Sequence, residues 1–292
     1  MKRKNILLIT IALFILTCGL YFTAELYITG KAEKKIENLV LKADEYVKIK
    51  YGKTRYFLLK NDLVISDLTL TIDNENILTI EKAVINKSDS KSKIPSYLDI
   101  SLNGIDIVNR TNESYINKFF DFLGYKEKMP LNLKLDYKYS KETGIFNINA
   151  LEIFSKNAGS LTCSFKFSNL IFENASFLDG LFSEDNPVLI EGATVKLTDN
   201  SITGKSLYTI SQLIKMDLPD FKKLLDLQID FYAKQINSNM SAESIGKIKN
   251  YINEPDEIVF TASPSKPVPL YTFYINYNKP FKLLNILEFQ VR

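Results

Sequence analysis

Four carboxylates in the middle of the chain are the side chains whose type and spacing could support acid–base chemistry. Asp99, Asp106, Asp136 and Glu152 each fall within a stretch of strand character. Two such carboxylates held close together can divide the roles of general acid and general base. The alternative interpretation is a solvent-facing position on an amphipathic strand, which Asp136 illustrates with a lysine two positions away on each side. We favour that interpretation, and we predict no catalytic residue.

The chain has no histidine among its 292 residues. It therefore lacks an imidazole base, a Ser-His-Asp triad and any histidine-ligated metal. Its sequence contains no glycine-rich phosphate loop, no CxxC pair and no nucleophile elbow. Cys18 and Cys163 are far apart in the sequence, and neither their spacing nor their neighbours indicate a metal site. We expect a protein that is not an enzyme and that uses no cofactor and no metal.

The charge balance bears on possible partners. The chain has 37 basic and 34 acidic residues, spread along its length, for a net charge of +3. No strongly basic face is indicated, and we expect no nucleic-acid partner. An apolar fraction of 46% with 24% charged residues is typical of a folded chain.

One stretch predicts a sheet with an apolar and a polar side. LNLKLDYKY, residues 131–139, has an apolar side chain at every odd position, and LTCSFKF, residues 161–167, alternates in the same way. Successive strand residues point to opposite faces, so each apolar set shares one face. That face is either the protein's own core or an open groove for lipid or a partner. Its residues are Leu131, Leu133, Leu135, Tyr137, Tyr139, Leu161, Phe165 and Phe167, with Cys163 between them.

The N-terminal residues have the pattern of a membrane anchor. Met1–Lys4 is basic, and Asn5–Ala24 is free of charge and long enough to cross the hydrocarbon core as a helix. A cleaved signal peptide is the alternative, but it requires a shorter apolar region and small residues at the cleavage site, unlike Phe22–Ala24. Lipoprotein processing at Cys18 would require a small residue before it, where the chain has Thr17. The basic tail favours a cytoplasmic N-terminus.

This topology predicts two parts. Residues 1–30 form a cytoplasmic tail and transmembrane anchor, and residues 31–292 form an extracytoplasmic β-rich domain with helices near 205–253. We therefore expect a single-pass protein of the bacterial inner membrane whose C-terminal domain lies in the periplasm. Residues 31–42 have helical periodicity, and this amphipathic segment would either pack on the domain as a stalk or lie on a lipid surface.

Apolar periodicity places the remaining elements. We expect an α+β fold in which the N-terminal transmembrane helix is followed by a long, curved antiparallel β-sheet with a C-terminal helical insertion. Strands are predicted at 47–51, 64–72, 78–85, 98–108, 131–139, 146–154, 161–167, 193–197, 257–262 and 271–277, and helices at 112–125, 207–216, 219–236 and 242–252.

Two parts of the sequence resemble a known group of proteins. They are VKIKYGKTRYFLLKNDLVISDLTLTID at Val47–Asp73, after the N-terminal apolar run, and the tail from ATVKLTDNSI at Ala193–Ile202 to PSKPVPL at Pro264–Leu270. In organisation the chain resembles the membrane-anchored periplasmic proteins of the YdgA type and, more remotely, the AsmA-like proteins of the Gram-negative envelope. The resemblance implies an inner-membrane anchor, a β-rich periplasmic domain and a part in envelope or outer-membrane lipid homeostasis.

These observations lead to one functional expectation and one alternative. We expect a non-enzymatic, membrane-anchored envelope protein that binds lipid or assists envelope homeostasis. The alternative is an anchored scaffold that binds an envelope protein through a free strand edge or an exposed apolar patch. An open apolar groove would favour lipid, whereas a closed core with one exposed patch would favour a protein partner.

Overall fold

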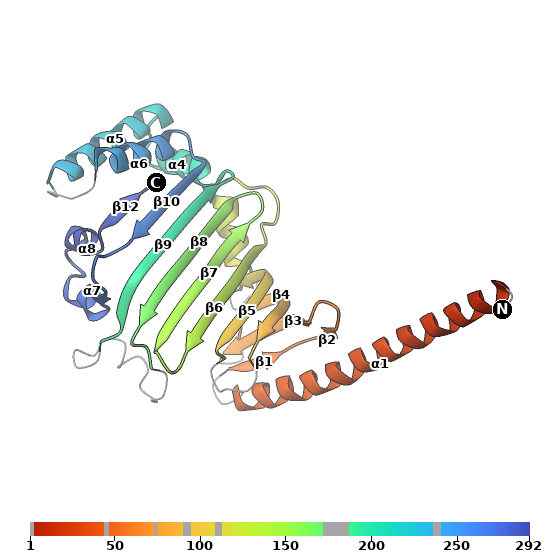
Figure 1. The fold of residues 1–292 in the computed structure, drawn as a ribbon. Coiled ribbons are helices and arrows are strands. Elements are labelled where there is room, and N and C mark those ends of the chain that lie inside the picture. The colour runs from red at the N-terminus through yellow and green to blue at the C-terminus, as the bar shows by residue number, and fades with distance from the viewer. Residues whose placement is uncertain are drawn as a thin grey trace. The chain divides into compact units, whose positions relative to one another are not determined.

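The structure is a computed structural model of the chain (Figure 1), and it describes residues 3–43, 47–72, 75–89, 95–108, 113–171, 187–235 and 241–292. The chain divides into two compact units. The first contains residues 1–87 and 100–114, and the second contains residues 88–99 and 115–292. The predicted domain of residues 31–292 thus includes residues of both units.

The first unit combines one long helix with antiparallel strands. Its elements are α1 (Arg3–Ala43), β1 (Lys48–Lys50), β2 (Thr54–Phe57), β3 (Asp62–Ile72), β4 (Glu75–Ser88) and most of β5 (Tyr97–Ile107). Strand β3 is central, because three strands pair with it. Strand β4 pairs with Leu63–Ile72, β1 pairs with Thr69–Thr71, and β2 pairs with Asp62–Ile65. The alternating apolar residues of β3 and β4 supply the buried Ile65, Ile80 and Ala83.

Polar contacts attach α1 to the strands of the first unit. The Glu25 side chain is buried, and its Oε1 accepts a hydrogen bond from Arg55 Nε at 2.9 Å. One turn later, Thr29 Oγ1 accepts from the Tyr56 backbone N–H at 3.0 Å. These contacts give residues 25–29 a protein-packing role.

The predicted membrane anchor is corrected by a direct finding. No helix in the described part of the chain is long and apolar enough to cross a membrane. This contradicts the transmembrane helix and, with it, the inner-membrane localisation. A span needs roughly 20 predominantly apolar residues, and the side chains of α1 that the structure describes begin at Leu20 and soon include Glu25, Lys31 and Glu33. Residues 5–19 of the predicted span have a helical backbone, but their side chains lie outside the described residues.

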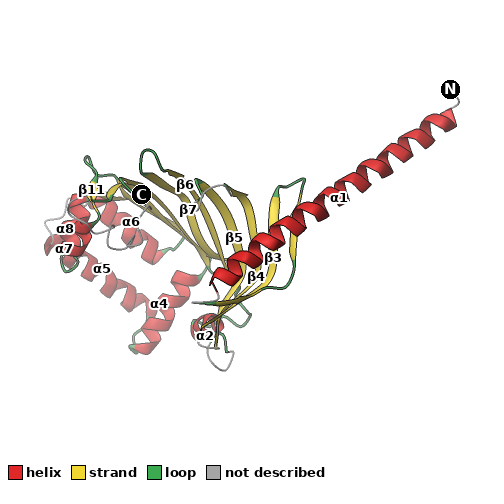
Figure 2. Cartoon of the chain, turned by 90° about the horizontal axis from the view of Figure 1, so that it is seen from below, coloured by secondary structure: helices red, strands yellow, loops and turns green. Residues whose placement is uncertain are grey.

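The second unit is built on long antiparallel strands (Figure 1). Strands β6 (Leu131–Ser140), β7 (Ile145–Ser155), β8 (Gly159–Ser168), β9 (Leu189–Asp199), β10 (Glu257–Ala262) and β12 (Phe289–Val291) follow one another in this order, and β11 (Val268–Pro269) pairs with β9. Its helices are α2 (Tyr115–Phe122), α4 (Ile202–Leu213), α5 (Leu218–Gln235), α6 (Ala242–Asn253), α7 (Tyr271–Ile275) and α8 (Pro280–Ile286). Figure 2 shows α4, α5 and α6 along one side of this strand layer.

Two bulges keep apolar residues on one face where the sequence alternation slips. In β7 the alternation changes phase between Ile148 and Leu151, and the register shifts at that point, so these residues oppose Tyr137 and Leu135 of β6. A second shift lies in β9 between Ile190 and Ala193. An extra residue in one strand restores the facing of the residues beyond it.

The turn between β7 and β8 receives the N-terminus of α4. The carbonyl oxygen of Ala158 accepts the backbone N–H groups of Asn200, Ser201 and Ile202, each at 3.1 Å. Gly159 has φ +140°, and a Cβ there would lie 2.4 Å from the carbonyl oxygen of Thr198, so the turn requires glycine. Helix α2 contributes to the same junction, whose buried apolar residues are Phe120, Leu123, Tyr125, Met129 and Ala158.

The C-terminal part differs from prediction at residues 271–277. This stretch alternates like a strand, yet its first five residues form α7. The preceding β11 occupies the edge of β9, and the carbonyl oxygen of Thr272 accepts both the N–H and the Nδ2 of Asn276, at 3.1 and 2.9 Å. Phe273 packs against a core cluster containing Ala262 and Leu287. Local hydrogen bonds and this packing therefore override the alternation.

Candidate functional site

The predicted apolar residues of β6 and β8 lie on one side of the second unit's strands. Directly opposed residues of antiparallel neighbours share a face. We call this surface the apolar face. From β6 to β10 its cross-strand rows are Leu133–Ile153–Leu161–Leu197–Ile258, Leu135–Leu151–Cys163–Val195–Phe260, and Tyr137–Ile148–Phe165–Ala193–Ala262; a fourth row, Tyr139–Phe146–Phe167–Ile190, continues to Val268 of β11. Leu131 shares the face by alternation, one position before the register with β7 begins.

Burial along the apolar face is graded. Ile258, which lies at the β10 end of its row, is only 2% exposed. Tyr137 and Tyr139 are also buried. The other predicted residues, Leu131, Leu133, Leu135, Leu161, Phe165 and Phe167, are half-buried, and so is Cys163. Burial raises the pKa of the Cys163 thiol. The face therefore retains apolar surface that water still reaches.

One end of the apolar face is aromatic. The ring centroids of Tyr137 and Phe146 are 5.1 Å apart, and Phe167 stacks on Phe146 and Phe165 with centroid distances of 6.4 and 6.0 Å. The hydroxyl of Tyr139 donates to the carbonyl oxygen of Leu170 at 3.2 Å. Stacked rings and a satisfied hydroxyl make this end a rigid apolar floor.

The opposite face is polar. Lys134, Glu152, Thr162 and Lys196 form one of its rows across β6 to β9. Lys196 also bridges Glu257 at 2.6 Å. These strands thus have one polar and one apolar side, as antiparallel sheets often do.

Asp136 and Glu152 lie on the paired strands β6 and β7 but do not oppose one another. Asp136 opposes Ala150 and accepts a hydrogen bond from Asn149 at 3.1 Å. Glu152 opposes Lys134. Asp106 belongs to the first unit, where it accepts from Ser114 Oγ at 2.5 Å, whereas Asp99 belongs to the second.

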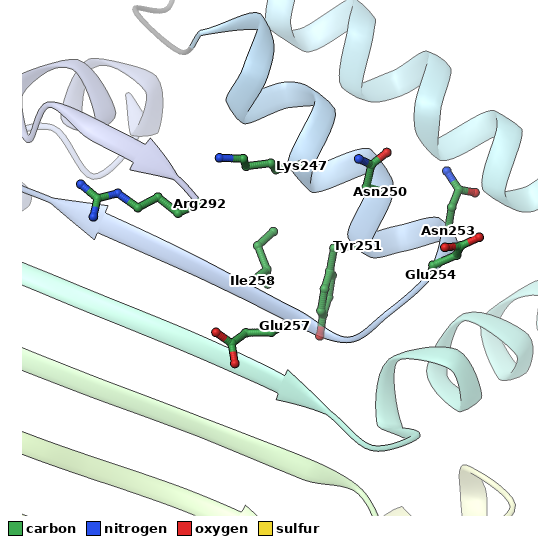
Figure 3. A pocket seen from close by; sticks show the side chains of 8 residues that line it. All are labelled: Lys247, Asn250, Tyr251, Asn253, Glu254, Glu257, Ile258 and Arg292. Carbon is green, nitrogen blue, oxygen red and sulfur yellow. The ribbon is translucent and has the colours of Figure 1, made fainter.

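A polar cleft of about 470 Å³ lies between α6 and β10 (Figure 3). Lys247 and Arg292 contribute positive charge, and Glu254 and Glu257 contribute negative charge. Lys247 is bound to Glu243 at 2.7 Å, and Glu257 is bound to Lys196. The hydroxyl of the lining residue Tyr251 is hydrogen-bonded to Thr203 at 2.9 Å, and burial raises its pKa. Balanced and partly neutralised charges give this cleft little preference for a ligand of either sign.

Sequence reasoning missed the contribution of β7 and β9 to the apolar face. The missed residues are Phe146, Ile148, Leu151, Ile153, Ile190, Ala193, Val195 and Leu197. Their alternation is broken once in each strand, at the bulges. Two short alternating runs in opposite phase, such as Phe146 with Ile148 and Leu151 with Ile153, are the signal that could have identified them.

Comparisons with known proteins give one partial match. A family model described only as "Uncharacterized protein" matches residues 152–292. No curated protein and no solved structure matches the chain. These results neither support nor contradict the resemblance to YdgA-type and AsmA-like proteins. The matched residues include β8, β9 and β10, which carry much of the apolar face.

Proposed function

We propose that this chain is a non-enzymatic binding protein that holds the aliphatic chain of a lipid on the apolar face. The observation that supports the proposal is the half-buried state of a continuous apolar surface, including Leu133, Leu161 and Phe165, on a sheet whose other side is polar. A ligand that covers this surface would remove it from water.

The dimensions and energetics suit a long aliphatic chain. Strands lie about 4.8 Å apart, so the five strands from β6 to β10 give the face a width of roughly 20 Å. Each methylene group removed from water contributes about 0.8 kcal/mol. The face offers apolar contacts and no row of polar groups. It therefore favours ligands with a long aliphatic chain over ligands with many hydrogen-bonding groups.

A matched pair of variants tests the proposal. Phe165→Gln places a polar side chain on the apolar face, whereas Ser164→Gln places the same side chain on the opposite face of the same strand. We expect the full-length protein, purified without detergent, to yield lipid by mass spectrometry of its organic extract. Phe165→Gln should lose most of that lipid while keeping its circular dichroism spectrum, and Ser164→Gln should keep it. Absence of lipid from the unchanged protein, or equal retention by the two variants, would contradict the proposal.

A second candidate is a scaffold that binds a protein partner through an apolar patch. Helix α5 favours it, because Leu227 is 67% exposed and Phe231 is 57% exposed one turn later. On this proposal, the double change Leu227→Gln and Phe231→Gln should remove a stoichiometric protein that co-purifies with the chain, while Lys234→Gln on the same helix should not. Retention of lipid with no such protein would argue against the scaffold.

A further inference from the structure

A second apolar surface in the second unit lies between α2 and α4, outside the four rows of the apolar face. It is a groove of about 580 Å³, with walls that include Phe122 of α2 and Tyr208 and Leu213 of α4. Volumes of this order are typical of small-molecule sites. We call it the α2–α4 groove.

The groove is fixed by a well-packed junction. Leu123, one of its lining residues, is buried with Phe120 and Tyr125 in a single cluster. The hydroxyl of Tyr125 is hydrogen-bonded to Ser201 Oγ at 2.7 Å, next to the start of α4. Because both helices are anchored to the same cluster, the space between them is part of the fold.

The walls of the groove remain exposed. Phe122 is 57% exposed, Tyr208 55% and Leu213 64%. Gly204, in the first turn of α4, also lines the groove, and a Cβ placed there would meet nothing within 4 Å. At Gly204 the α4 wall of the groove therefore has no side chain.

One cation lines this apolar space. Lys205 Nζ donates to the carbonyl oxygen of Gly124 at 3.2 Å and lies 4.6 Å from the ring centroid of Tyr125. Among the described residues, no carboxylate lies within ion-pair distance of this ammonium. An ammonium has three donors, so a neutral carbonyl and a ring face leave donor capacity for an anionic ligand.

We propose that the α2–α4 groove binds a single-chain amphiphile with an anionic headgroup. The aliphatic chain lies against Phe122, Tyr208 and Leu213, and the headgroup binds the ammonium of Lys205. A carboxylate and a phosphate share this chemistry, because a lysine binds either as a point charge. This site is separate from the lipid site proposed on the apolar face. Its ligand is defined by the charge of the headgroup as well as by the aliphatic chain.

The chain contains no tryptophan, so one introduced residue can report on the groove alone. Gln212 lines the groove and is exposed, so Gln212→Trp provides that reporter in the full-length protein. Its fluorescence is titrated with dodecanoate, dodecyl phosphate and dodecanol, each below its aggregation concentration. We expect both anions to bind about tenfold more tightly than the alcohol, the size of effect typical of a charge-assisted hydrogen bond. The tighter of the two anions identifies the headgroup.

Three changes in this background separate the headgroup from the chain. Lys205→Met should lower the affinity for both anions about tenfold and leave that for dodecanol unchanged, and Lys205→Arg should restore anion binding. Gly204→Leu should abolish the response to all three compounds by filling the groove. Gly246→Leu, at an equally open glycine of α6, is the control that should change nothing. Leucine has a higher helix propensity than glycine, and a Cβ at either position has open space around it, so both leucine variants should remain folded.

Each opposite result would overturn part of the proposal. An unchanged response in Gly204→Leu would show that the groove is not the site. Equal affinity for dodecanol and the anions, or anion binding unaffected by Lys205→Met, would remove the headgroup assignment. Phe165→Gln, which tests the apolar face, should leave the Gln212→Trp response intact, so failure at one site is distinguishable from failure at the other.

Discussion

The apolar face and the polar cleft beside α6 are accessible surfaces of the second unit that meet at Ile258, which also lines the cleft, and they differ in what is left for a ligand to contribute. In the cleft, Lys247 and Glu257 are already bound to partners within the chain. On the apolar face, side chains such as Leu161 and Phe165 remain partly in contact with water. The hydrophobic effect is proportional to the apolar area removed from water. Covering the apolar face with a ligand should therefore release more free energy than binding a ligand in the cleft.

The largest expected effect concerns the gradient of burial within one row of the face. Ile258→Ala should lower the free energy of unfolding by about 3 kcal/mol, because Ile258 is 2% exposed and its removal leaves a cavity. Leu133→Ala, in the same row but half-buried, should cost about 1 kcal/mol. Urea unfolding of both variants measures the difference. Large and equal losses of unfolding free energy in the two variants would show that the whole face is a closed core. The contrast with the cleft would then no longer hold.

A second prediction concerns the reactivity of Cys163 at the centre of the face. Burial raises the pKa of its thiol, and the thiolate is the reactive form. At any pH below that raised pKa the folded protein holds less thiolate than the unfolded chain. The pH profile of labelling should therefore lie at higher pH in the folded protein than in urea.

The labelling is measured in a Cys18→Ser background, which leaves a single thiol. The matched control adds Cys163→Ser and Ser164→Cys, moving the thiol by one residue to the polar face. The pH profile of labelling at position 164 should lie closer to that of the unfolded chain. Coinciding profiles for the two positions would show that the faces do not differ in solvation.

The smallest effect is expected for the exposed ion pair of Glu257 at the cleft. Glu257→Gln breaks the bridge to Lys196, but both side chains are more than 40% exposed. Exposed ion pairs contribute little, so the free energy of unfolding should fall by about 0.5 kcal/mol or less. Thermal unfolding at low and high salt is the measurement. A loss comparable with that of Ile258→Ala would show that this ion pair contributes more than its exposure suggests.

The sequence predicted strands best where alternation is unbroken. Residues 131–139 and 161–167 alternate without fault and are strands, and β10 has the bounds that were predicted for it. In β7 and β9 the alternation indicates strands, but the sharing of one face depends on bulges, which only the pairing with neighbours fixes. Residues 271–277 show the converse, because local hydrogen bonds and the packing of Phe273 gave a helix over Tyr271–Ile275 despite the alternation.

The least predictable features depend on contacts between distant residues. An apolar run of sufficient length suggested an anchor, while the buried Glu25 and its partner Arg55, 30 positions away, were invisible in the pattern. The α2–α4 groove likewise arises because Ala158 and Tyr125 hold α4 beside α2. Neither contact has a local sequence signature.

The most direct measurement of whether the apolar face holds a lipid chain is the labelling rate of Cys163 with and without lipid. The Cys18→Ser protein is stripped of lipid by organic extraction under native conditions, divided, and half is reloaded with the lipid identified in the extract. If the aliphatic chain of the lipid lies on the apolar face, it covers Leu151 and Val195 beside Cys163. Reloading should then slow the labelling of Cys163 about tenfold or more. The labelling rate of the Ser164→Cys control should not change. Equal rates at Cys163 in the stripped and reloaded protein would contradict lipid binding on this face.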